Sequence, residues 1–411
     1  MMTKKPIKHQ ILSDARIIKA KKLINETVKD FQEKYITSIL NPNIEIEKNL
    51  NHAKSLRGGK LFFPYISSSL GNGSKVLLTD GSIKLDFING IGAHFGHGLE
   101  FLRNASIDAA IEDTIMQGNL QQNERSFELM KLLINKSSMD HCILTTSGAM
   151  ANENGLKLLF HKNPQKNRIL AFENCFMGRT ISLAQITDKA KYRTGLPTSI
   201  HIDYIPFYDS KSPKKSIQKT TESIHKFLKR YPNQYAGICM ELIQGEGGYN
   251  IGNTAFFNTI INIMKNESIN ILVDEVQTFG RTSELFASEH FNILKQVDVI
   301  TIGKLSQVCA TLYRKELKPE PGIISQTYTA STTAIECGYQ IINYLIKNQH
   351  FGINGKNMVF GNYFNNLIKK VSEKQKNKIS GPYGIGGMLV FTPYNGNPQK
   401  TGELLIKLFQ N

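Results

Sequence analysis

The chain has 411 residues, of which 40% are hydrophobic and 20% are charged, so it has enough apolar material for a substantial buried core. Its formal net charge of +16 comes from 50 basic and 34 acidic residues, and such a charge attracts anions such as phosphorylated cofactors and carboxylate substrates. The basic residues are scattered along the chain and form no arginine-rich tract, which argues against a nucleic-acid surface. Composition therefore favours a globular protein with small anionic ligands and no nucleic-acid partner.

The five cysteines stand far apart, form no CxxC pair and are odd in number. This pattern argues against a disulfide framework and a zinc knuckle, and it favours a reducing compartment. The basic N-terminus has no apolar segment behind it, and no later stretch approaches the roughly 18 apolar residues that a membrane span requires. We therefore predict a cytoplasmic protein with no membrane partner.

The first hundred residues have their own pattern. Residues 11–40 show helical spacing, and segments 75–78 and 84–88 flank an Asp-Gly turn that is typical of a β-hairpin. We predict that residues 1–104 form an N-terminal segment and part of a small α+β lobe. His94 and His97 lie in a glycine-rich stretch without cysteine or carboxylate partners at ligand spacing, so we expect no metal site there.

From about residue 105 to residue 330, strand-like and helix-like segments alternate. The predicted strands are 141–146, 168–172, 236–243, 270–276 and 298–302, and helical periodicity marks 124–135, 149–160 and 256–265. Nearly continuous apolar strands between helices predict an α/β fold, in which a mostly parallel sheet is covered by helices. We assign residues 105–330 to this large domain. Residues 331–411, with a glycine-rich segment at 381–387 before a last amphipathic helix, should complete the small lobe, which both termini would then build.

Two strands of this predicted sheet end in complementary charges. The apolar run 271–273 leads into Asp274, and the run 297–302 leads through a glycine into Lys304. The carboxyl ends of parallel strands lie at one edge of a sheet, where such folds bind their ligands. A lysine facing a carboxylate suits pyridoxal phosphate, because the lysine can hold the aldehyde as a Schiff base while the acid keeps the pyridine nitrogen protonated.

Three further strand ends carry polar or glycine-rich loops. Ser147, Gly148 and Ala149 open a helix after strand 141–146, where a phosphate or an ordinary helix cap would fit. Phe176 and Arg179 follow strand 168–172, and they could stack on a flat ring and bind a carboxylate, or be a core phenylalanine and a surface arginine. Glu241 and Glu246 flank a glycine-rich turn that could bind a substrate ammonium group or gate an arginine.

Taken in order, the segments TTSGAMANENGLK, FENCFMGRT, ELIQGEGGY, ILVDEVQTFGRT and ITIGKLSQV resemble the successive signatures of the class III aminotransferases. This pyridoxal-phosphate family contains the ornithine, acetylornithine, 4-aminobutyrate and lysine 6-aminotransferases. The resemblance covers roughly residues 60–395. It implies fold type I of the pyridoxal-phosphate enzymes, with a seven-stranded type of sheet, and pyridoxal 5′-phosphate as the cofactor.

The resemblance also implies a role for each candidate residue. Lys304 would hold the cofactor and then move the proton, and Asp274 would pair with the pyridinium nitrogen. Gln277 would bond to the ring's phenolic oxygen and Phe176 would stack on its face, while the phosphate would be bound by Ser147, Gly148, Ala149 and, from the neighbouring subunit of a homodimer, Thr327. Arg179, Glu241 and Glu246 would bind substrate.

The implied reaction is ping-pong transfer of an amino group, from the ω-position of a lysine- or ornithine-type donor, to 2-oxoglutarate. The segment GKLSQV resembles lysine 6-aminotransferase, and acetylornithine aminotransferase-like chemistry is the alternative. The family pattern continues beyond the last predicted helix with an arginine-bearing strand, whereas this sequence ends at Asn411. A shortened C-terminal lobe is therefore expected, and a catalytically impaired homologue that binds the cofactor stays open as a third reading.

Overall fold

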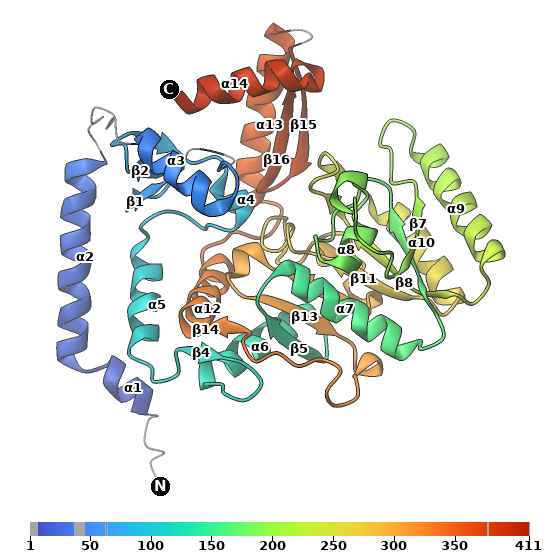
Figure 1. The fold of residues 1–411 in the computed structure, drawn as a ribbon, viewed down its shortest axis with the longest axis horizontal. Coiled ribbons are helices and arrows are strands. Elements are labelled where there is room, and N and C mark those ends of the chain that lie inside the picture. The colour runs from blue at the N-terminus through green and yellow to red at the C-terminus, as the bar shows by residue number, and fades with distance from the viewer. Residues whose placement is uncertain (1–6, 37–45, 62, 64, 376–377, 411) are drawn as a thin grey trace. The chain divides into compact units, whose positions relative to one another are not determined.

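A computed structural model describes residues 7–36, 46–61, 63, 65–375 and 378–410 (Figure 1). The chain divides into two compact units, Met1–Ile115 and Met116–Asn411. The predicted division into three parts, with boundaries at residues 104 and 330 and a lobe shared by both termini, stays a prediction. Within the described ranges, no helix combines the length and the apolar character needed to cross a membrane.

The first unit contains helices and a small antiparallel sheet. Its elements are α1 (Ile7–Leu12), α2 (Ala15–Tyr35), α3 (Ile46–Arg57), β1 (Ser67–Asn72), β2 (Lys75–Leu78), β3 (Ile83–Leu85), α4 (Asn89–Gly92) and α5 (Glu100–Ala110). The predicted hairpin is confirmed, because β2 and β3 pair antiparallel. The predicted helical segment 11–40 corresponds to the end of α1 and all of α2, and its last four residues lie outside the described ones. The buried amide of Gln32 ties α2 to β1 by donating to the Gly71 carbonyl at 2.6 Å.

The second unit is built around a large sheet. Among the described residues this sheet has seven strands, in the order β5 (His141–Thr145), β13 (Cys309–Tyr313), β12 (Val299–Ile302), β11 (Asn270–Asp274), β8 (Tyr235–Glu241), β6 (Arg168–Phe172) and β7 (His201–Ile205). All neighbouring pairs are parallel except those of β13, which runs antiparallel to both β12 and β5. The predicted mostly parallel sheet is confirmed. The strands β7 and β13 were missing from the prediction.

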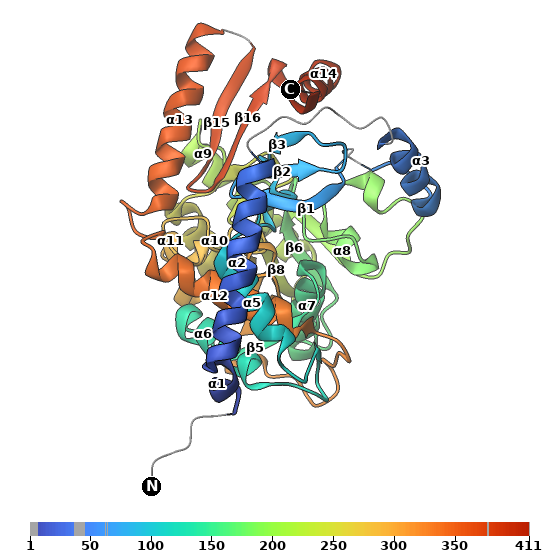
Figure 2. The ribbon, with the colours of Figure 1, turned by 90° about the vertical axis from the view of Figure 1, so that its left-hand side faces the viewer.

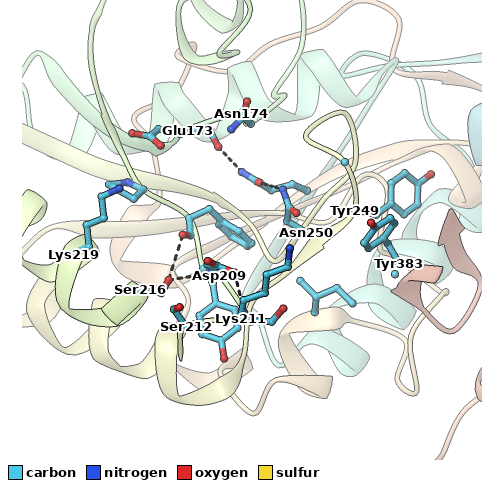
Figure 3. A pocket seen from close by; sticks show the side chains of 18 of the residues that line it. Glu173, Asn174, Asp209, Lys211, Ser212, Ser216, Lys219, Tyr249, Asn250 and Tyr383 are labelled. Atoms are coloured by element: carbon cyan, nitrogen blue, oxygen red, sulfur yellow. Dashed lines mark hydrogen bonds between the residues drawn. The ribbon is translucent and has the colours of Figure 1, made fainter. Parts of the chain in front are cut away.

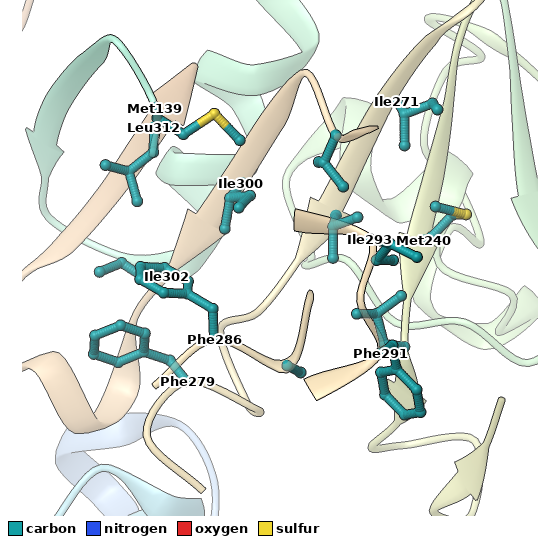
Figure 4. Close-up of a cluster of buried hydrophobic side chains, with 14 of the residues drawn as sticks. Met139, Met240, Ile271, Phe279, Phe286, Phe291, Ile293, Ile300, Ile302 and Leu312 are labelled. Atoms are coloured by element: carbon teal, nitrogen blue, oxygen red, sulfur yellow. The ribbon is translucent and has the colours of Figure 1, made fainter. Parts of the chain in front are cut away.

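Helices cover both faces of this sheet, as alternation along its strands shows. In β11, Ile271 and Val273 belong to one buried cluster and Leu272 to another. The first cluster includes Phe256 of α10 (Thr254–Asn266), and the second includes Leu159 of α7 (Gly148–Lys162). Successive side chains of a strand point to opposite faces, so α10 and α7 lie on opposite sides of the sheet. Figure 4 shows part of the first cluster.

The remaining helices of this unit are α6 (Glu124–Ser137), α8 (Ile181–Ile186), α9 (Pro213–Arg230), α11 (Ala287–His290), α12 (Thr332–Lys347), α13 (Lys356–Lys374) and α14 (Pro398–Gln410). Short strand pairs join β4 (Met116–Gln117) to β14 (Ala330–Ser331) and β9 (Ile243–Gln244) to β10 (Asn250–Ile251). The glycine-rich segment before the last helix forms most of β15 (Ile379–Ile385), which pairs with β16 (Met388–Pro393). Helix α13 lies alongside this hairpin (Figures 1 and 2).

Candidate active site

Asp274 and Lys304 meet at the carboxyl edge of the sheet. Asp274 is the last residue of β11 and is paired in register with Thr301 of β12, and Lys304 follows β12 after one glycine. Burial raises the pKa of Asp274 to about 6, against hydrogen bonds from Val276 and Asn152 and the charge of Lys304, which lower it. Burial also lowers the pKa of Lys304, and the positive charge of Arg281 adds to that shift. The lysine and the carboxylate therefore act on each other electrostatically.

The backbone at Lys304 is itself unusual. Its φ of +54° lies in the left-handed region that side-chain-bearing residues rarely adopt. Such a conformation persists only where the surrounding structure requires it, and functional sites are where it is commonly found.

A cavity of about 340 Å³ surrounds this pair. Its walls are Gly148, Ala149, Asn152, Phe176, Met177, Gly178, Arg179, Glu241, Asp274, Val276, Gln277 and Lys304. Most of the site residues predicted from the sequence thus lie around one cavity, although they come from five separate segments. Of the predicted residues, all of which the structure describes, Ser147, Glu246 and Thr327 lie outside this lining.

The N-terminus of α7 forms one wall. Ser147 is the N-cap, and its hydroxyl accepts a hydrogen bond from the Met150 amide at 3.2 Å, so the ordinary capping role is present. Gly148 faces Val276 so closely that a Cβ would lie 2.7 Å from a Val276 methyl carbon. A larger residue at this position would require Val276 to shift. The first-turn amides and the positive end of this 15-residue helix are suited to an anion.

Phe176 and Arg179 lie on the loop after β6. The Arg179 guanidinium lies 4.2 Å from the ring centre of Tyr192 and 5.8 Å from that of Phe176. The two rings meet edge to face at 6.4 Å. The two ring contacts restrain an exposed arginine without using its hydrogen-bond donors. Tyr192 lies outside all the segments that carry the family resemblance.

Glu241 joins two of the loops. Its buried carboxylate accepts hydrogen bonds from the Phe176 amide at 2.8 Å and from the Gly245 amide at 3.1 Å. Burial, with the nearby charge of Asp274, raises the pKa of Glu241 to about 8. Gln277 lies against the same turn, because a Cβ on Gly245 would collide with its side-chain amide. Glu241 thus positions Phe176 while it faces the cavity.

Two of the predicted residues are farther out. The charge of Glu246 raises the pKa of Lys304, so this carboxylate lies within electrostatic reach although it does not line the cavity. The Thr327 carbonyl lies against Gly118, where a Cβ would approach it to 1.8 Å. The structure holds a single copy of the chain, and the role of Thr327 toward a second subunit stays a prediction.

Two polar residues of the site had no predicted role. Asn152 is a buried amide one turn after Gly148 that bonds to Asp274, and a polar residue on the sheet-facing side of a helix was the available signal. Arg281, in the segment after Asp274, donates to the Gln277 carbonyl, and its charge acts on Lys304. Burial lowers the pKa of Arg281 to about 10.

A second, larger cavity of about 930 Å³ is lined in part by the segment 248–251 (Figure 3). Its walls include Asn174, Asp209, Lys211, Lys219 and Tyr249. Neither Asp274 nor Lys304 lines it. We place the chemistry in the smaller cavity because the perturbed lysine and carboxylates converge there.

A half-buried lysine opposite a buried carboxylate, at the carboxyl edge of a doubly covered α/β sheet, defines the site of an enzyme that handles a carbonyl group or an amine. The family model of the class-III aminotransferases matches residues 61–403. The chain belongs to this family, and its members depend on pyridoxal 5′-phosphate. The predicted family, enzyme class and cofactor are confirmed.

Relatives in sequence are named acetylornithine aminotransferase. Those of Caldanaerobacter subterraneus and Methanocaldococcus jannaschii are each 28% identical to this chain, over 74% and 78% of it and over 76% and 78% of their own length. Among solved structures, lysine aminotransferase from M. tuberculosis superimposes with a TM-score of 0.77 at 18% identity, covering 88% of this chain and 90% of that one. Ornithine aminotransferase from Toxoplasma gondii gives 0.71 at 20% identity, covering 83% and 80%. These structures share the fold.

The residues around the cavity fit this cofactor. Lys304 offers the amine for its aldehyde, Asp274 offers the acid for its ring nitrogen, and α7 offers amide donors for its phosphate. The absence of a side chain at Gly148 lets the start of α7 lie close against Val276 in the wall of the cavity.

Proposed function

We propose that the protein transfers the ω-amino group of a lysine- or ornithine-type donor to 2-oxoglutarate by a ping-pong mechanism. The observation that carries the proposal is the convergence of Lys304, Asp274 and Arg179 on one cavity. Two of the solved neighbours are named for lysine and ornithine, which are both diamino acids with a terminal amine. A fixed guanidinium can bind a carboxylate of such a donor or of the oxo acid through a bidentate pair of hydrogen bonds.

The proposed roles follow from the positions of the side chains. The cofactor, when bound, draws electrons from the carbon that carries the amine. Lys304 bonds to the cofactor and, once released by substrate, carries the proton, a task that suits a lysine with a lowered pKa. Asp274 holds the ring nitrogen, Phe176 covers a ring face, and Gln277 bonds to the phenolic oxygen. The phosphate is held by Ser147, Gly148 and Ala149 and by Thr327 of a second subunit in a homodimer.

Substrate selection is assigned to Arg179, Glu241 and Glu246. Arg179 lies against the rings of Tyr192 and Phe176, a contact that leaves its N–H groups available for a carboxylate. Glu246 is placed to act on the ammonium group of a donor, since its charge already acts on Lys304. The five cysteines are free thiols, which supports the proposed cytoplasmic location.

Acetylornithine is the second candidate donor, because the sequence relatives carry the name acetylornithine aminotransferase. Its α-amine is acetylated and therefore uncharged, whereas lysine and ornithine carry a positive α-ammonium group. The charges near Glu246 therefore determine which of these donors binds better. A panel of lysine, ornithine and N-acetylornithine with 2-oxoglutarate, read by glutamate formation, separates the candidates. Parallel lines in double-reciprocal plots support ping-pong transfer, and intersecting lines contradict it.

The assignment of Lys304 has a direct chemical test. Borohydride reduction of the loaded wild-type protein should fix the cofactor to the peptide that contains Lys304, as mass spectrometry of a digest would reveal. Lys304→Ala should carry no reduced cofactor and should lose at least about 1,000-fold in turnover, because both the covalent anchor and the proton carrier are gone.

Lys157→Ala is the matched control, since Lys157 is an exposed lysine of α7 that donates to the Ile323 carbonyl. This variant should keep the label and the activity. A label that persists at full level in Lys304→Ala would rule out the proposed site.

A further inference from the structure

Asn152 is a buried amide at the centre of the site. Its side chain is 1% exposed, and its Nδ2 group donates to Asp274 Oδ2 at 2.7 Å and to the Met177 carbonyl at 2.8 Å. Its Oδ1 accepts a hydrogen bond from the Thr301 hydroxyl at 2.6 Å. One side chain of α7 therefore connects the end of β11, the loop that carries Phe176 and Arg179, and β12 just before Lys304.

The two acceptors beside Asn152 set which way its amide points, and the Thr301 hydroxyl holds the other end of that amide. A flipped amide would place the Asn152 oxygen against the Asp274 carboxylate and the Met177 carbonyl, and two acceptors would then face it without a proton between them. The hydroxyl of Thr301, which is fully buried, supplies the donor that matches the observed orientation. Thr301 thus acts on Asp274 through Asn152.

Both oxygens of Asp274 are engaged by the protein. Oδ1 accepts the Val276 amide at 2.8 Å, and Oδ2 accepts Asn152. Hydrogen bonds donated to a carboxylate favour its ionised form. Both bonds lower the pKa of Asp274 against the opposing effect of burial. These two hydrogen bonds therefore orient the carboxylate and favour its ionised form, while the carboxylate faces the cavity.

We propose that Asn152, oriented by Thr301, is a positioning residue that fixes the Asp274 carboxylate toward the ring nitrogen of the bound cofactor. This inference rests on the proposed function, because it needs pyridoxal phosphate in the cavity. Within the described part of the chain, Thr301 does not line the cavity, and its hydroxyl donates to Asn152 rather than to the Asp274 carboxylate. The hydrogen bond of its hydroxyl therefore reaches the Asp274 carboxylate through the amide, separately from the pairing of the two residues in the sheet.

The test uses holoenzyme with two cofactors. One is pyridoxal 5′-phosphate and the other is its 1-deaza analogue, in which carbon replaces the ring nitrogen but the aldehyde and phosphate remain. Thr301→Val removes the hydroxyl at nearly constant volume, and Thr301→Ser retains it. Retention of each cofactor after dilution, followed by its absorbance, measures how well it is held.

Thr301→Val should weaken retention of pyridoxal phosphate roughly tenfold to a hundredfold and that of the deaza analogue less than about twofold, since only the former has a nitrogen for Asp274 to hold. Thr301→Ser should behave like wild type. Thr311→Val is the matched control. Thr311 is as buried as Thr301, and its hydroxyl donates to the backbone carbonyl of Ala151 in the same helix rather than to the side-chain amide of Asn152. If the Asn152→Ala protein folds, its loss of pyridoxal phosphate retention should equal or exceed that of Thr301→Val.

Equal losses for both cofactors, or equal behaviour of Thr301→Val and Thr311→Val, would mean that the hydroxyl only supports the fold, and the proposal would be overturned. Failure of the proposed function looks different. In that case wild-type protein itself would retain neither cofactor and would carry no label at Lys304 after borohydride treatment.

Discussion

At the scale of single residues, Glu241 shows how burial and hydrogen bonding act on the pKa of one carboxyl group in opposite directions. Its carboxyl group is surrounded by protein and lies near the carboxylate of Asp274, yet it accepts two backbone amides from different loops. The amides favour the ionised form, while burial and the neighbouring acid favour the protonated one. With a pKa raised to about 8, Glu241 changes charge several pH units above an ordinary glutamate.

The pH dependence of stability follows from this shift. In the unfolded chain the Glu241 pKa returns to its ordinary value of 4.5, so the folded protein binds the proton more tightly. The associated stabilisation is complete below about pH 4.5 and is lost as the pH rises through about 8, by an amount on the order of a few kcal/mol. The free energy of unfolding of cofactor-free protein, measured in urea, should therefore fall between about pH 5 and about pH 8.5.

Glu241→Gln should remove a large part of this slope, because the amide does not titrate. The part that is left should come from the other carboxyl groups whose pKa burial raises, which include Asp274, Glu275 and Asp298. Glu173→Gln, at an exposed glutamate just after β6, should keep the wild-type slope. An unchanged slope in Glu241→Gln would show that this carboxyl is not the group that titrates.

At the scale of elements, α7 is the helix on which the site depends. It carries Gly148 and Asn152 at its start and packs on the sheet through Gly155, where a Cβ would lie 2.5 Å from a Leu272 methyl carbon. Leu272 is fully buried and cannot swing away into solvent. The close approach of helix and sheet therefore sets the position of the phosphate-binding end.

Gly155→Val should destabilise the protein by about 1–3 kcal/mol through overpacking, although valine has a better helix propensity than glycine. It should also weaken cofactor retention, because a shift of α7 away from the sheet would move Asn152 away from Asp274. Gly402→Val is the control, since Gly402 lies in α14 and a Cβ there would meet no atom within 4 Å. Urea unfolding would measure both variants, and equal stabilities would refute the close packing of α7.

At the scale of the whole molecule, the strands of the large sheet share an apolar cluster on the face that α10 covers. Phe256 of α10 is fully buried, and its ring lies 5.6 Å from that of Phe172 on β6 and 5.7 Å from that of Phe207 after β7. The same cluster continues through Ile271 and Ile300 (Figure 4). Removal of the Phe256 ring is thus expected to destabilise strands that the ring does not touch.

Phe256→Ala should cost about 3–5 kcal/mol and accelerate amide hydrogen exchange in β6, β8 and β11 alike. Phe360→Ala, at a half-exposed phenylalanine of α13, should leave exchange in these strands unchanged. Exchange mass spectrometry of peptides from each strand provides the comparison. Faster exchange in only one strand would indicate that the sheet does not open as one unit.

The sequence by itself determined the sheet and the pair at its edge. Apolar runs that end in Asp274 and Lys304 must bring these residues to one edge if the strands are parallel, because parallel strands end on the same side. The antiparallel strand β13 was not predicted, because the local pattern of an apolar run does not indicate in which direction the segment pairs with its neighbours.

Only the tertiary structure decided which side chains support that pair. Asn152 meets Asp274 from 122 positions away and Thr301 from 149, and the Arg179 guanidinium is held by Tyr192 from outside any selected motif. Periodicity along a helix or strand reports which face is buried. It does not report the partner on the other side of the contact, because that partner is chosen by the packing of distant segments.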